Sequence, residues 1–84
     1  MSKYERLRQE ILSAQKDANI PFAELCHLME RFGFDVRISG SHHIFRKSGI
    51  EEKVNLQKDG NKAKPYQVRQ VRQIILKYNL GGEA

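Results

Sequence analysis

Three short stretches in the middle of the chain alternate between apolar and polar residues and are separated by tight turns. Residues 34–39, 42–47 and 53–57 follow this pattern, with Gly40-Ser41 and the segment 48–51 between them. Alternation with a period of two is typical of strands that bury one face. Links this short join antiparallel neighbours, because parallel strands need a long crossover. The pattern therefore predicts a three-stranded antiparallel meander.

Apolar residues at helical spacing precede and follow these strands. Residues 4–18 carry a narrow apolar stripe typical of an amphipathic helix, made of Tyr4, Leu7, Ile11, Ala14 and Ala18. A second helix is expected from Pro21, which suits a first turn, to Gly33, which tolerates the left-handed conformation of a helix end. Residues 58–64 read as a polar, basic loop. Pro65 then opens a last helix that is expected to end at Gly81-Gly82, with an apolar face of Val68, Val71, Ile74 or Ile75, and Tyr78.

Eighty-four residues suffice for one domain with a thin core. We therefore expect a single α+β domain over residues 1–84, in the order α-α-β-β-β-α, with the helices packed on one face of the sheet. Within it we expect a core at 21–80, a helical extension at 4–18 and a flexible tail at 81–84.

The balance of charge favours a polyanionic partner. Fifteen Lys and Arg residues against ten Asp and Glu give a net charge of +5. Such a charge suits nucleic-acid phosphates, anionic lipid or an acidic protein surface, and does not choose among them. Cys26 is the only cysteine, so no internal disulfide can form and a reducing compartment is expected. With no apolar run of membrane-spanning length and no signal-peptide core, we expect a cytoplasmic protein without membrane contact.

Two histidines, His42 and His43, begin the second predicted strand directly after the Gly40-Ser41 turn. Imidazole can transfer protons near neutral pH, which makes the pair a candidate for acid–base chemistry. Adjacent strand residues point to opposite faces, so the two rings cannot act on one atom. We expect one ring to face solvent or a cleft and the other to lean towards the core. The alternative is that both rings only form local hydrogen bonds.

Side chains that point in different directions cannot bind one metal ion, which argues against a metal site at His42-His43 or at Cys26-His27. Cys26 and His27 are neighbours on a helix and point about 100° apart, and complete ligand sets are absent. We expect neither a metal nor another cofactor. His27 is expected to be a partly buried structural residue, and Cys26 a small core residue without an activated thiol.

Cations gather around the start of the last helix and on the strands. Lys62 and Lys64 precede the helix, where free backbone N–H groups also favour a phosphate. Arg69 and Arg72 share one helix face. One interpretation is a continuous basic surface with the strand cations Arg46, Lys47, Lys53 and Lys58; the alternative is a solvated helix face. Tyr66 or Tyr78 could stack on an unpaired base, although packing at the core or its rim explains these rings as well.

One segment carries a family resemblance. Gly-Ser-His-His-Ile-Phe-Arg at 40–46 follows a helix with Gly33-Phe34 and precedes a third strand and a Val-Arg-Gln-Val-Arg-Gln-Ile-Ile helix. This order resembles the HicA family of toxin–antitoxin mRNA interferases over about residues 21–80, and 61–69 resembles one branch of it. Many members have a proline near the end of the third strand, where this chain has Leu56-Gln57-Lys58-Asp59.

The resemblance implies a double-stranded-RNA-binding-domain-like fold and a metal-independent endoribonuclease that cleaves mRNA with one essential histidine. It also implies a HicB-type antitoxin that covers the site, and no DNA binding by this chain alone. The family histidine maps onto His42, with His43 as the alternate because some members carry it one position later. Ser41 would orient the imidazole or the phosphate. The expected RNA contacts are Arg46, Lys47, Lys62, Lys64, Arg69 and Arg72.

Two other functions remain open from the residues. The first is a non-catalytic RNA-binding module of the same fold. The second is a protein-interaction domain whose positive surface serves an acidic partner. The helix at 4–18 lies outside the common family core and would be either an extra antitoxin contact or a lid on the apolar face.

Overall fold

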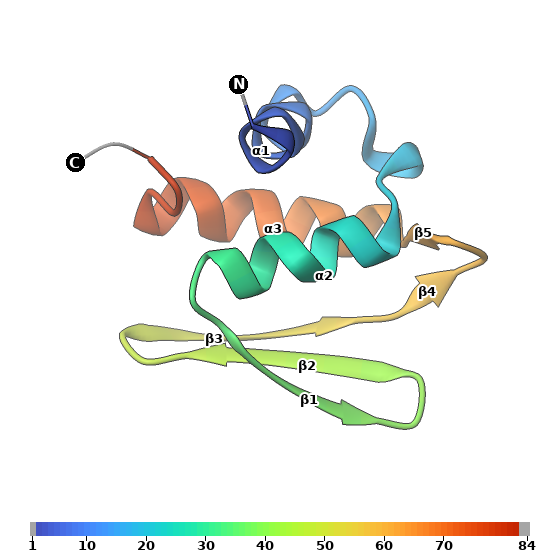
Figure 1. The fold of residues 1–84 in the computed structure, drawn as a ribbon, viewed down its shortest axis with the longest axis vertical. Coiled ribbons are helices and arrows are strands. Elements are labelled where there is room, and N and C mark those ends of the chain that lie inside the picture. Colours follow the sequence, from blue (N-terminus) through green and yellow to red (C-terminus); the bar gives the residue numbers. More distant parts are fainter. Residues whose placement is uncertain (1, 83–84) are drawn as a thin grey trace.

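The computed structural model of the chain describes residues 2–82, so residues 83 and 84 of the tail expected at 81–84 lie outside it. Figure 1 shows three layers: the sheet, then α2 and α3, then α1 on their far side. The predicted α+β class, with a three-stranded antiparallel sheet and helices on one face, is confirmed. In chain order the elements are α1 (Lys3–Ser13), the 3-10 helix η1 (Asp17–Asn19), α2 (Phe22–Arg31), β1 (Asp35–Ser39), β2 (His42–Lys47), β3 (Ile50–Leu56), β4 (Lys58–Asp59), β5 (Lys62–Ala63) and α3 (Pro65–Tyr78).

The sheet is the predicted meander, in the order β1-β2-β3. Gly40 takes a φ of +61° in the turn between β1 and β2, a conformation that costs glycine little. Phe45 pairs with Val36 on one side and with Val54 on the other. Both Phe45 and Val54 are fully buried. Because paired residues share a face, this register assigns one face of the sheet to the core and leaves the alternate residues on the other.

The core lies between this face and the helices. Helices α2 and α3 each place an apolar stripe on it, and α1 adds Leu7 and Ile11 from the far side. The predicted apolar face of α3 is confirmed, since Val68, Val71 and Ile75 are at most 1% exposed. β3 begins at Ile50, earlier than predicted, because Ile50 pairs with Lys47 and its side chain is buried.

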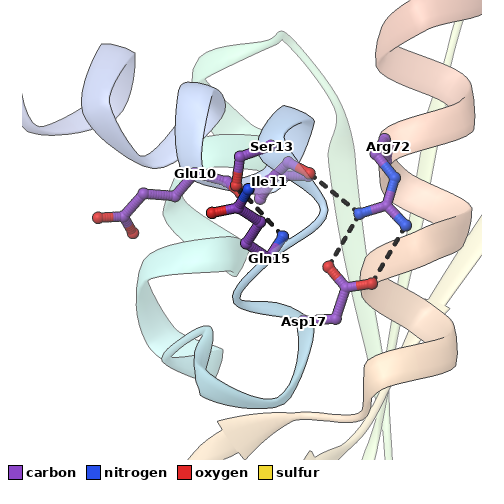
Figure 2. A network of polar contacts seen from close by, with 6 residues as sticks. All are labelled: Glu10, Ile11, Ser13, Gln15, Asp17 and Arg72. Atoms are coloured by element: carbon purple, nitrogen blue, oxygen red, sulfur yellow. Dashed lines mark hydrogen bonds and ion pairs between the residues drawn. The ribbon is translucent and has the colours of Figure 1, made fainter.

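Helix α1 ends at Ser13, so the prediction of a helix to residue 18 was wrong. Ala14 adopts the left-handed conformation with φ 60°, and Ala14 and Ala18 are exposed. A carbonyl at a helix end needs a hydrogen-bond partner. The Ile11 carbonyl has two: it accepts from the Ala14 N–H at 3.2 Å and, as Figure 2 shows, from the Arg72 guanidinium of α3 at 3.0 Å.

Two further boundaries differ from the prediction. Of the predicted loop at 58–64, residues 58–63 form the β4–β5 hairpin, because their backbone also pairs with residues at and just before the start of α2. The Phe22 N–H donates to the Asn61 carbonyl at 3.0 Å, and the Ala63 N–H donates to the Ile20 carbonyl at 2.9 Å. Helix α3 ends at Tyr78, before Gly81-Gly82, since Asn79 takes the left-handed cap conformation with φ 52°.

Candidate functional site

His42 lies on the open face of the sheet, within a polar network that spans β2 and β3. Its Nδ1 is 3.0 Å from Oδ1 of Asn55, and its Nε2 is 3.4 Å from Nε2 of Gln57. Asn55 pairs with Ile44, two residues along β2 from His42, so the hairpin register brings these side chains together. The imidazole is only partly exposed.

The two contacts select one form of the ring. An amide oxygen can only accept, so Nδ1 of His42 donates its hydrogen to Asn55. An amide nitrogen can only donate, so Nε2 of His42 accepts from Gln57. Both contacts are satisfied by one neutral tautomer, protonated on Nδ1 with a lone pair on Nε2. In that state the ring can take a proton at Nε2.

Gln57 is the centre of the network. Its Nε2 also donates to Oγ of Ser41 at 3.2 Å, and its Oε1 accepts from Nζ of Lys64 at 3.3 Å. Its backbone N–H donates to Oε1 of Gln67, a side chain only 4% exposed. Gln57 therefore connects the β1–β2 turn, the start of α3 and the His42 ring.

Sequence reasoning selected His42, Ser41 and Lys64, and missed Asn55 and Gln57. A signal for both was available. Asn55 and Gln57 alternate with the buried Val54 and Leu56, so they share the open face of β3. The pattern could not reveal the register in which β2 and β3 pair. That register places Asn55 and Gln57 opposite the His42 end of β2.

His43 points the other way, under the helices. Its ring meets the Phe22 ring edge-on, with centroids 4.9 Å apart. Its Nδ1 is buried and has no hydrogen-bond partner within the described residues. The ring lines a hollow of about 290 Å³ between α2 and β1, beside Cys26 and Ile38. The prediction that one histidine faces out and the other leans towards the core is confirmed.

Arg72, predicted as an RNA contact, has a structural partner instead. Its guanidinium donates to both carboxylate oxygens of Asp17, at 2.8 and 3.1 Å, and also to the Ile11 carbonyl (Figure 2). The Arg72 hydrogen bond lowers the pKa of Asp17. Both side chains are less than a fifth exposed. Arg72 therefore holds η1 and α1 on α3, and we remove it from the RNA-contact set.

The remaining cations do not form one continuous surface. Arg46 is exposed and alternates with the buried Phe45, so it lies on the open face with His42. Lys47 packs beside Gly33, and Lys58 lies over the Phe22 ring at 5.9 Å, both towards the helices. Arg69 is exposed near Asp17, whose pKa it also helps to lower.

Cys26 and His27 contribute no chemistry at this site. Burial, followed by the charge of Glu30, raises the pKa of the Cys26 thiol to about 11, as expected for a thiol that is not activated. His27 is exposed, so its prediction as a partly buried residue was wrong. Within residues 2–82, no cluster of three or more His, Cys, Asp or Glu side chains is arranged to hold a metal ion. None of the helices described is long and apolar enough to cross a membrane.

Comparison with known proteins places this site in a family context. No match was found among curated proteins or among solved structures. A protein-family model described as HicA toxin of bacterial toxin-antitoxin matches residues 22–78. The match covers more than half of the chain and includes α2, all five strands and α3. The α+β fold is the double-stranded-RNA-binding-domain-like fold of that family. The chain therefore belongs to the HicA family of toxins from bacterial toxin–antitoxin systems.

Proposed function

We propose that this protein is the toxin of a type II toxin–antitoxin pair and that it cleaves mRNA as a metal-independent endoribonuclease. We further propose that His42 is its proton-transfer residue and that a HicB-type antitoxin inhibits it. The family match supports the proposal of a ribonuclease toxin, because ribonuclease activity is the activity of this family. The observation that carries the residue assignment is the hydrogen bond between Nδ1 of His42 and Asn55, which leaves a basic Nε2.

RNA supplies its own nucleophile, which suits a site built around one histidine. The 2′-hydroxyl attacks the adjacent phosphorus, and its proton passes to Nε2 of His42 in place of the Gln57 contact. The bond from phosphorus to the 5′-oxygen breaks, and that oxygen takes a proton from the imidazolium or from water. The products are a 2′,3′-cyclic phosphate and a 5′-hydroxyl. No oxidant, metal or activated cofactor is required for this balance.

Lys64 is the cation best connected to this chemistry. Its Nζ donates to the same Gln57 amide that contacts His42 and Ser41. A fixed positive charge stabilises the dianionic phosphorane that forms during attack. We keep Lys64, Lys62 and Arg46 as proposed RNA contacts. Lys47 points towards the helices and Arg69 lies near Asp17, so we assign neither a role in cleavage.

The test is cleavage of labelled mRNA in EDTA by the wild type, His42→Ala and His43→Ala. We expect His42→Ala to lose roughly 10²–10⁴-fold in rate while it keeps its circular dichroism spectrum and its affinity for RNA. His43→Ala should melt at a lower temperature, because it removes a ring packed on Phe22, and should still cleave. If His42→Ala still cleaves RNA and a folded His43→Ala does not, His43 is the proton-transfer residue.

The same assay separates the nuclease from its alternatives. Intact RNA with a gel shift for the wild type would identify a non-catalytic RNA-binding module. Failure to bind any RNA at any salt concentration would indicate a protein-interaction domain. The antitoxin is tested separately: a HicB-type protein encoded beside the gene should co-purify with the toxin and block cleavage.

A further inference from the structure

The open face of the sheet continues from His42 as a basic surface. Phe45, Val54 and Leu56 are fully buried beneath the helices, so the residues that alternate with them point to the uncovered face. In Figure 1, α1, α2 and α3 lie on the opposite side of the sheet. This uncovered face is hollowed, with a volume of about 480 Å³, and is lined by Asp35, Val36, Arg37, Ile44, Arg46 and Lys53.

The chemistry of this face is that of an anion site that also includes two apolar residues, Val36 and Ile44. Arg37, Arg46 and Lys53 come from three different strands, and all three are exposed. Within residues 2–82 none of them forms an ion pair or a side-chain hydrogen bond. Asp35 is the one carboxylate of the lining. Ile44 lies between the cations, opposite Arg37 in the register of β1 and β2.

The face is continuous with the His42 network. Ile44 lies between His42 and Arg46 on β2, and Asn55, which binds His42, pairs with Ile44 across the hairpin. His42 and Arg46 are four positions apart on the strand, a distance of about 13 Å. A chain of a few nucleotides with its reacting phosphate at His42 would therefore reach all three cations.

We propose that the RNA cleaved at His42 lies on this face as a single strand, with phosphates held by Arg37, Arg46 and Lys53 and a base or ribose packed on Ile44. The proposal rests on the proposed function. A single strand fits better than a duplex, because the 2′-hydroxyl must rotate into line with the leaving oxygen, which A-form stacking opposes. Charge complementarity and continuity with His42 favour RNA over a protein occupant. No aromatic ring lies among the lining residues, so binding should depend on backbone charge more than on sequence.

The test measures binding without cleavage, in the His42→Ala protein, to a single-stranded RNA at several salt concentrations. The face variant adds Arg37→Gln, Arg46→Gln and Lys53→Gln. The matched control adds Lys3→Gln, Arg6→Gln and Lys16→Gln, which remove the same charge from the α1 region on the far side of the molecule. Each phosphate contact on a single strand contributes about 0.7 to the salt slope of log K, so the face variant should lose about 2 and the control much less.

Equal slopes for the face variant and the control would overturn the proposal. So would a face variant that binds RNA like the control but no longer binds the neighbouring antitoxin, since the face would then be a protein interface. The result can be separated from the catalytic assignment: cleavage by His42→Ala would refute that assignment, and the slopes would then be compared with a 2′-O-methylated RNA, which lacks the attacking hydroxyl. Absence of RNA binding by the wild type would refute both.

Discussion

His42 and His43 are neighbours in sequence with opposite surroundings, and elementary strand geometry explains most of the difference. His43 is two residues from the buried Phe45 on β2, so the two side chains share a face of the strand. The apolar pattern of β2 therefore already indicates that His43 faces the helices. His42 is then left on the polar side. Which polar groups meet it was not predictable, because Asn55 and Gln57 are brought to it by the hairpin register.

At the residue scale we predict that Asn55→Ala slows cleavage about fivefold through kcat, with KM nearly unchanged. The hydrogen bond from Nδ1 of His42 to Asn55 keeps the Nε2 lone pair available, and one hydrogen bond contributes about 1 kcal/mol. Steady-state cleavage of a short RNA measures both constants. Asn55→Asp is the matched control, since it keeps an acceptor oxygen, and should retain most of the wild-type kcat. An equal loss in both variants would show that Asn55 does not act through the ring.

At the scale of elements, local patterns predicted which helices and strands exist, and long-range contacts help to fix several of their boundaries. The alternating stretches and the glycine turns identified the three strands. Ala14 caps α1 locally, and Arg72, which is 61 residues from Ile11 in the chain, adds a contact to this end that no local signal encodes. The β4–β5 hairpin depends on backbone pairing with Ile20 and Phe22.

A contact between α3 and β3 leads to a prediction about pH. The Tyr78 hydroxyl donates to Glu52 at 2.6 Å and Lys77 donates at 2.9 Å, and together they lower the pKa of Glu52 from 4.5 to about 2. A carboxylate with a lowered pKa stabilises the fold above its unfolded pKa, and this stabilisation is lost as the pH falls towards the folded value. Tyr78→Phe should therefore lower the melting temperature at pH 7, and by much less near pH 2.

Thermal melts between pH 7 and pH 2 measure this difference. Tyr66→Phe is the control, because Tyr66 is on the same helix, is 56% exposed and has no part in the contact. Its melting temperature should follow that of the wild type at every pH. A deficit in Tyr78→Phe that stays constant down to pH 2 would mean that the Tyr78 hydroxyl stabilises the fold independently of the charge on Glu52.

At the scale of the whole molecule, the region matched by the family model begins at residue 22, yet α1 shares the core of the domain. Ile11 is fully buried, and Asp17 binds Arg72 of α3. The layer formed by α1 is on the far side of α2 and α3 from the sheet, in which β2 carries His42 (Figure 1). We therefore propose that α1 is a structural lid that folds together with the rest of the domain and is remote from catalysis.

This proposal predicts that Ile11→Ala destabilises the entire domain by about 2–5 kcal/mol, because it leaves a cavity between α1 and the helices beneath it. Urea unfolding should remain a single transition with an unchanged slope, and RNA cleavage by the folded fraction should be normal. Gln9→Ala, on the exposed face of the same helix, should change stability by less than about 0.5 kcal/mol. If Ile11→Ala gave two transitions, with α1 lost before the sheet and its two helices, α1 would be an accessory segment, and the domain that folds would be the one the family model describes.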